Sequence, residues 1–171
     1  MIDNLMVSVV VPLFNKAHTI CKTLDSVLTQ DFTNLEVVVV DDGSTDAGPE
    51  LVREVSDARV SLICTSNLGQ SSARNTAIKN STGDLIAFID ADDLWDPDHV
   101  STLVDLYCAH PDAGVVATAY RSIYPGNLIL AIRYLEKHIE SQLWLLNDYF
   151  DVVSHEPYVW VSAVAVPRSV F

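Results

Sequence analysis

Short apolar runs alternate along the chain with segments whose apolar residues recur at the spacing of a helix. Four runs rich in β-branched residues have the length and continuity of strands buried on both faces, at residues 7–13, 35–40, 59–64 and 85–89. The segments between them have helical periodicity, at residues 17–30, 47–55 and 69–80. Strands and helices in this order are typical of βαβ units, so the pattern predicts an α/β fold with a mostly parallel sheet flanked by helices.

The alternation continues less regularly toward the C-terminus. Asp96-Pro97 predicts the start of a helix that extends to residue 110, because proline suits the first turn, and a fifth strand is expected at 114–118. Helical periodicity then covers residues 128–146, and a β-branched alternation predicts a strand at 160–166. No repeat, low-complexity segment or linker divides the chain, so we expect a single domain over residues 1–171.

Polar residues precede two of the predicted helices and are candidate N-caps. Ser71 or Ser72 would cap the helix at 69–80, and Asp93 or Asp96 would cap the helix that begins near Pro97.

Charge excludes several classes of binding protein. Ten Lys and Arg against 23 Asp and Glu give a formal net charge of −13. Non-specific nucleic-acid binding and docking on anionic lipid both need basic side chains, so we expect neither. Three scattered cysteines favour a reduced, cytoplasmic setting over a disulfide framework, and no apolar run approaches the ~20 residues of a membrane helix. An anionic substrate would need a metal ion or helix N-terminal amides to offset the surrounding carboxylates.

Two acidic clusters follow predicted strands, where parallel α/β sheets bind their ligands. Asp90 and Asp92, one residue apart, form a D-x-D pair whose carboxylates suit Mg²⁺ or Mn²⁺ with substrate phosphates as further ligands. The Asp41-Asp42 pair, in the stretch VVVVDDGSTD, could accept hydrogen bonds from the N–H of a nucleobase or from ribose hydroxyls. The alternative is local: an Asx-type turn, with Ser44 or Asp46 capping the next helix and the other carboxylates solvated.

Two further residues are candidates for ligand contacts. Arg74 follows a run of small residues near a predicted helix start, where it could reach a diphosphate or a base, or instead pair with a surface acid. Trp160 is a candidate for acceptor contact, although packing is the simpler role. The five histidines have no metal-ligand spacing, and no Walker loop, G-x-S-x-G elbow or G-x-G-x-x-G fingerprint is present.

Five segments together resemble a known family. They are SVVVPLFNK, SVLTQDF, VVVVDDGSTD, NLGQSSARNTAIKNSTGDLIAFIDADDLWDPDHV and SAVAVPRSVF, in this order. The series resembles the family 2 inverting glycosyltransferases over nearly the whole chain. The resemblance implies a GT-A-like (Rossmann-like) fold, with residues 1–118 as the nucleotide-sugar-binding part and residues 119–171 as the start of the acceptor-side part.

The resemblance also implies roles for the residues of the base pocket. Asp42 would contact the uracil of a UDP-sugar, with Asp41 the less favoured choice. Pro12 and Phe14, in the PLFN stretch, would line the base pocket, and Asn15 would shape its loop.

The same resemblance assigns the diphosphate end of the site. Arg74, in the ARN triplet, would contact the nucleotide, Asp90 would lie near the ribose, and Asp92 would ligate the Mn²⁺ or Mg²⁺ that bridges the diphosphate. In the family the catalytic base follows the strand that matches SAVAVPRSVF, and the sequence ends at Phe171. We therefore assign no catalytic base, expect it beyond Phe171, and expect an N-terminal fragment with little transferase activity of its own.

The implied reaction transfers a sugar from a nucleotide-sugar donor to a hydroxyl of a glycan or lipid-linked acceptor, with inversion, in cell-surface polysaccharide or glycan synthesis. We expect a cytoplasmic location. Contact with the inner face of the membrane would require segments of a longer protein outside these 171 residues. A non-catalytic nucleotide-sugar-binding module is the main alternative. A Mg²⁺-dependent receiver-type domain is disfavoured because no suitably placed lysine follows a later strand, and a nucleotidyltransferase because PLFNK replaces its glycine-rich loop.

Overall fold

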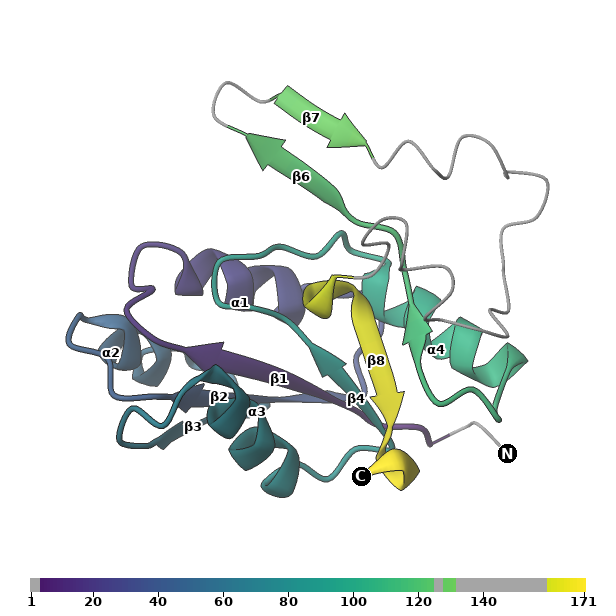
Figure 1. Ribbon diagram of the computed structural model, residues 1–171, viewed down its shortest axis with the longest axis horizontal. Coiled ribbons are helices and arrows are strands. Elements are labelled where there is room, and N and C mark those ends of the chain that lie inside the picture. Colours follow the sequence, from purple (N-terminus) through teal and green to yellow (C-terminus); the bar gives the residue numbers. More distant parts are fainter. Residues whose placement is uncertain (1–3, 125–127, 132–159) are drawn as a thin grey trace.

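A six-stranded sheet forms the centre of the protein, seen in the computed structural model of residues 4–124, 128–131 and 160–171 (Figure 1). The strand order is β3-β2-β1-β4-β8-β5, and β8 runs antiparallel to both of its neighbours while β1 to β4 are mutually parallel. The strands are β1 (Val7–Leu13), β2 (Leu35–Asp41), β3 (Val60–Cys64), β4 (Leu85–Phe88), β5 (Val116–Ala117) and β8 (Val164–Pro167). The mostly parallel α/β sheet predicted from the sequence is confirmed.

Four helices cover the two faces of this sheet, and two 3-10 turns flank β8 (Figure 1). The helices are α1 (Ile20–Leu28), α2 (Gly48–Arg53), α3 (Gln70–Lys79) and α4 (His99–Ala109), and the turns are η2 (Val161–Ala163) and η3 (Arg168–Val170). In the described residues, no helix is long and apolar enough to cross a membrane.

Strand β1 is buried along its whole length because both faces of the sheet are covered. Its odd-numbered residues, such as Val9, pack in one core cluster with side chains of α1, α2 and α4, including Leu24 and Leu103. Its even-numbered Val10 packs in a second cluster with Ala77 of α3. The alternation of side chains along a strand thus divides the core into two layers.

Two expectations for the C-terminal third are wrong in part. Residues Leu128–Ala131, expected to begin a helix, form strand β7, which pairs antiparallel with β6 (Arg121–Tyr124) as a separate two-stranded sheet. The remainder of the predicted helix lies outside the described residues. A short apolar run fits either state, and backbone pairing with β6 decides it. The strand expected at 160–166 begins only at Val164, after η2.

The predicted helix caps are also wrong. Helix α3 begins at Gln70 after the N-cap residue Gly69, whose φ of 92° suits glycine, so Ser71 and Ser72 already lie within the helix. Helix α4 begins at His99 with Asp98 as its N-cap residue, so neither Asp93 nor Asp96 occupies the cap position. The carboxylates of Asp93 and Asp96 instead bind side chains from elsewhere in the chain.

The turn between α3 and β4 is tied to β1 and β2 by a compact polar cluster. The Gly83 N–H donates to Ser8 Oγ at 2.7 Å, and Ser8 Oγ donates to Glu36 Oε1 at 2.7 Å. Burial raises the pKa of Glu36, but hydrogen bonds from Ser8, Thr82 and Gly83 outweigh it and leave that pKa below its usual value. A Cβ at Gly83 would meet Ser8 Oγ at 2.6 Å and a backbone oxygen at 2.7 Å, so the cluster leaves room only for glycine.

We expect Gly83→Ala to lower the free energy of unfolding by about 2 kcal/mol, because the added methyl must displace backbone atoms. Urea denaturation followed by circular dichroism measures the loss. The control is Gly114→Ala, where the new Cβ has nothing within 4 Å. Equal denaturation midpoints for the two variants would contradict this account of the turn.

Candidate active site

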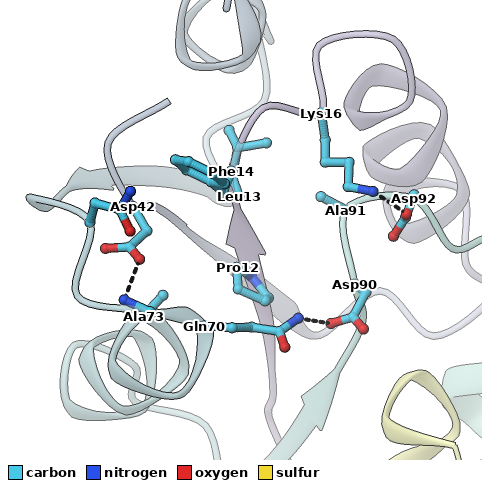
Figure 2. Close-up of a pocket in the computed structure, with 12 residues that line it drawn as sticks. Pro12, Leu13, Phe14, Lys16, Asp42, Gln70, Ala73, Asp90, Ala91 and Asp92 are labelled. Atoms are coloured by element: carbon cyan, nitrogen blue, oxygen red, sulfur yellow. Dashed lines mark hydrogen bonds and ion pairs between the residues drawn. The ribbon is translucent and has the colours of Figure 1, made fainter. Parts of the chain in front are cut away.

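An open cleft of about 270 Å³ lies at the carboxyl ends of β1, β2 and β4 (Figure 2). The ends meet there because β1 pairs with both other strands in parallel. The cleft is lined by Pro12, Leu13, Phe14, Lys16, Asp42, Asn67, Gly69, Gln70, Ala73, Asp90, Ala91 and Asp92. Most of these residues belong to the stretches PLFNK, NLGQSSA and DAD, so three distant parts of the sequence build one site.

Asp42 holds one end of the cleft. It directly follows β2, is 4% exposed, and accepts hydrogen bonds from the backbone N–H groups of Leu68 (2.8 Å, Oδ1) and Gly69 (2.7 Å, Oδ2) and from Thr65 Oγ1 (3.0 Å, Oδ1). Burial raises the pKa of Asp42, but these donors outweigh burial and hold the pKa below its ordinary value. The carboxylate therefore stays ionised at neutral pH, and Oδ2 retains capacity to accept a bond from a ligand.

Asp41 has the local role that the sequence left open as an alternative. Its Oδ1 accepts the N–H of Ser44, three residues further on, at 3.1 Å, so the carboxylate stabilises the local turn, and the residue does not line the cleft. Asp46 lies two residues before the first residue of α2 and accepts from the N–H of Gly48 at 3.0 Å, the spacing of an Asx turn. It also accepts from the N–H of Ala17 at 2.9 Å.

Asp90 and Asp92 form the other end of the cleft. Asp90 Oδ1 accepts from Arg74 Nη2 at 2.5 Å and from Gln70 Nε2 at 3.1 Å, so two side chains of α3 orient it. Asp92 Oδ2 lies 2.5 Å from Lys16 Nζ. Each carboxylate is thus paired with a cation from a different part of the chain, Asp90 with Arg74 and Asp92 with Lys16. Figure 2 shows the second of these pairs.

The acidic loop after β4 is held in place from two sides. On the α1 side, Thr23 Oγ1 donates to the carbonyl oxygens of Ala91 and Asp93, both at 3.0 Å. On the η2 side, Ser162 Oγ accepts from the Asp90 N–H at 2.9 Å and donates to Asp93 Oδ2 at 2.5 Å. This anchoring fixes the backbone from which the two cleft carboxylates project.

The loop after β1 forms the rim beside Asp42. Pro12 is buried in the cleft wall, whereas the Phe14 ring is 44% exposed and offers an apolar face to a ligand. Asn15 has a φ of 51°, and its Oδ1 accepts from Thr45 N at 2.8 Å and Thr45 Oγ1 at 3.2 Å. Asn15 therefore shapes the loop and does not line the cleft.

The structure brings together most of the residues singled out in the sequence. Five of them line the cleft: Pro12, Phe14, Asp42, Asp90 and Asp92. The other two, Arg74 and Asn15, act on a cleft carboxylate and on the cleft loop, respectively. The sequence did not single out Lys16, Gln70 or Asn67, although all three stand inside the quoted motifs. Ser162 is the first residue of the quoted segment SAVAVPRSVF, but its contact with Asp90 arises only from the fold.

Two carboxylates fit a hard divalent cation that takes its remaining ligands from phosphate and water. Among the described residues, no group of three or more His, Cys, Asp or Glu side chains is placed to hold a metal ion. A divalent cation held by these carboxylates would therefore need further oxygen ligands from a bound molecule or from water.

The chain belongs to glycosyl transferase family 2, whose model matches residues 8–160. This match confirms the resemblance seen in the sequence, and the solved structures described next confirm the GT-A-like fold.

Three similar proteins illustrate the family. The beta-1,3-glucosyltransferase WfgD of Escherichia coli, named for UDP-Glc and alpha-D-GlcNAc-diphosphoundecaprenol, is 43% identical over 54% of this chain and 37% of its own length. The mannosyltransferase PcManGT of Pyrobaculum calidifontis, solved with GDP-Man and Mn²⁺, has a TM-score of 0.64 and 36% identity over 69% of this chain and 36% of its own. TarS of S. aureus, solved with UDP-GlcNAc, has a TM-score of 0.60 and 30% identity over 64% of this chain and 33% of its own. The chain thus spans about a third of the length of each.

His99 lies behind the acidic loop. Its ring stacks on Trp95 with centroids 4.5 Å apart, Nδ1 lies 3.3 Å from Thr118 Oγ1, and Nε2 is buried with no hydrogen-bond partner in the described part of the chain. Burial lowers the pKa of His99 to about 4, against an opposing effect of Asp96 and Asp98. The folded state thus keeps the imidazole neutral at pH values where the unfolded chain protonates it.

This difference makes stability depend on pH. Because the pKa of His99 is lowered in the folded state, its contribution is fully present above pH 6.5 and falls by about 3 kcal/mol as the pH drops to about 4. The stability gap between the wild type and His99→Gln should shrink by that amount over this range, measured by urea denaturation at each pH. Val104→Ala, which removes packing from the same helix without removing a titratable group, should show a gap independent of pH. A constant gap for His99→Gln would contradict the assignment.

Proposed function

We propose that the protein is the donor-binding part of an inverting glycosyltransferase that uses a nucleotide-sugar, with a UDP-sugar as donor. The observation that carries the proposal is the cleft itself, which has an ionised acceptor, Asp42, at one end and the Asp90–Asp92 pair at the other. A nucleotide-sugar has the matching order of groups: a base that donates N–H, a ribose, and a diphosphate that binds a metal.

In this proposal the base lies against Phe14 and Pro12, and the uracil N3–H donates to Asp42. Asp90, oriented by Arg74 and Gln70, accepts from the ribose hydroxyls. Asp92 would hold Mn²⁺ or Mg²⁺, which supplies positive charge for the leaving diphosphate. Arg74 offsets the charge of Asp90 and so lowers the repulsion that a diphosphate meets at this end of the cleft.

The reaction is a direct displacement, in which an acceptor hydroxyl attacks the anomeric carbon and the nucleoside diphosphate leaves from the opposite face. A base must remove the hydroxyl proton. No described residue is assigned to that step.

The names of relatives support the acceptor class. WfgD is named for alpha-D-GlcNAc-diphosphoundecaprenol, and another relative, ExoO of Rhizobium meliloti, is named a succinoglycan biosynthesis protein. We infer a glycan or lipid-linked acceptor, a role in cell-surface polysaccharide synthesis, and action at the cytoplasmic side of a membrane.

Calorimetric titration with UDP, GDP and dTDP, each with and without Mn²⁺, tests the site. We expect UDP to bind most tightly and Mn²⁺ to strengthen its binding at least tenfold, and we expect Asp92→Ala to abolish the metal effect. The matched control, Asp105→Ala, removes an exposed carboxylate from the middle of α4. A metal effect that survives in Asp92→Ala would contradict the metal assignment, and a folded protein that binds none of the nucleotides would contradict the proposed function.

The role of Asp42 predicts discrimination between pyrimidines. The N3 of uracil carries a hydrogen, whereas the N3 of cytosine does not, so the carboxylate should favour UDP over CDP by about tenfold. In Asp42→Ala this preference should vanish. Because the substitution also removes an acceptor from Leu68 and Gly69, a thermal melt must first establish that the variant is folded at the titration temperature. Undiminished preference in the folded variant would exclude Asp42 as the base reader.

A further inference from the structure

Among the described residues that line the cleft, Lys16 is the one lysine or arginine, against three carboxylates. Its Nζ lies 2.5 Å from Asp92 Oδ2 and faces into the cleft from the loop after β1 (Figure 2). The carboxylate that a divalent cation would use is therefore already paired with a cation of the chain.

The Lys16 ammonium and a metal ion cannot both occupy the position next to Asp92 Oδ2. A bound Mg²⁺ lies about 2.0–2.1 Å from a carboxylate oxygen, and the ammonium already stands at hydrogen-bond distance from the same oxygen. The two positive charges would also repel each other strongly at such a separation. A metal that uses Asp92 Oδ2 must therefore displace the Lys16 side chain.

The displacement costs little. The side chains of Lys16 and Asp92 are 38% and 42% exposed, and ion pairs in such surroundings contribute about 1 kcal/mol or less. The lysine side chain can leave Asp92 without disturbing the core.

The backbone of Lys16, by contrast, is fixed. Its carbonyl oxygen accepts from the N–H groups of Thr19 (3.1 Å) and Ile20 (3.0 Å), and the next N–H, of Ala17, donates to Asp46 Oδ2 at 2.9 Å. Hydrogen bonds from Ala17 and Gly48 outweigh burial and hold the pKa of Asp46 below its usual value, so this anchor stays ionised at neutral pH. A displaced ammonium consequently remains within one side-chain length of the cleft.

We propose that the Lys16 ammonium neutralises Asp92 in the ligand-free protein. When the metal binds Asp92, the ammonium moves to the diphosphate of the donor and pairs with it there. The inference rests on the proposed function, because it requires a metal–diphosphate ligand in this cleft. It assigns Lys16 two opposite effects: it competes with free metal, and it strengthens the binding of the metal–nucleotide complex.

Lys16→Met tests both effects, because methionine keeps an unbranched apolar stem and removes the charge. Free Mn²⁺, measured by its electron paramagnetic resonance signal, should bind about threefold more tightly to this variant than to the wild type when no nucleotide is present. UDP titrated calorimetrically at saturating Mn²⁺ should bind about tenfold more weakly. Lys16→Arg should keep the affinity for the Mn²⁺–UDP complex, and Lys22→Met, an exposed lysine on α1, should match the wild type in both measurements.

The outcomes separate this inference from the proposed function. Opposite changes in the two affinities support it. Unchanged affinities in Lys16→Met, with normal binding by the wild type, overturn the role of Lys16 and leave the proposed function standing. A weakening of both metal binding and nucleotide binding also overturns the role of Lys16, since a lysine that only shapes the loop would give that result. A wild-type protein that binds no nucleotide with Mn²⁺ overturns both, and thermal melts of each variant exclude misfolding as the cause.

Discussion

The parallel pairing of β1 with β2 on one side and β4 on the other is the constraint on which the rest of the structure depends. Parallel strands end on the same edge of a sheet, so residues that lie 28 positions apart (β1 and β2) or 78 positions apart (β1 and β4) along the chain become neighbours there. The pairing is stable because β1 is buried on both faces, by α3 on one side and by α1, α2 and α4 on the other. Packing of the apolar layers thus fixes where the carboxylates stand.

Charge balance is the second determinant of the site. A chain with a net charge of −13 gathers three carboxylates in one cleft and pairs two of them with cations, Lys16 on Asp92 and Arg74 on Asp90. Asp42 is stabilised differently, by backbone N–H groups and a hydroxyl. These three environments suit three different parts of one ligand. In the proposed function, the acceptor fixed by amides reads the base, and the carboxylate paired with a partly exposed lysine exchanges that partner for a metal ion.

Local sequence patterns predicted those features that depend on local physics. The strands at 7–13 and 35–40 and the helix at 69–80 were predicted to within a residue or so at each end, because a continuous apolar run or a helical stripe determines them. The caps at Ser71, Asp93 and Asp96 were wrong because long-range partners and the φ of Gly69 decide where those helices begin. The pattern of residues 128–131 predicts a helix, whereas these residues form strand β7, because pairing with β6 determines their state.

The candidate site shows the same division between features that the local sequence predicts and features that depend on long-range contacts. Acidic strand ends at Asp42, Asp90 and Asp92 follow from the rule that ligands bind at the carboxyl edge of the sheet. The roles of Lys16 and Ser162 could not be predicted, since their partners Asp92 and Asp90 lie 76 and 72 positions away along the chain and only the fold brings them together. The resemblance to the family supplied the type of ligand, which no pattern of charges determines alone.

A crystal structure of the protein with UDP and Mn²⁺, with anomalous difference density to locate the metal, tests the central claim most directly. The account predicts a manganese peak within coordination distance of Asp92, the uracil against Phe14 with its N3 facing Asp42, and the Lys16 ammonium on the diphosphate. A nucleotide bound outside this cleft, or a metal coordinated away from Asp92 while the nucleotide is in place, would contradict it.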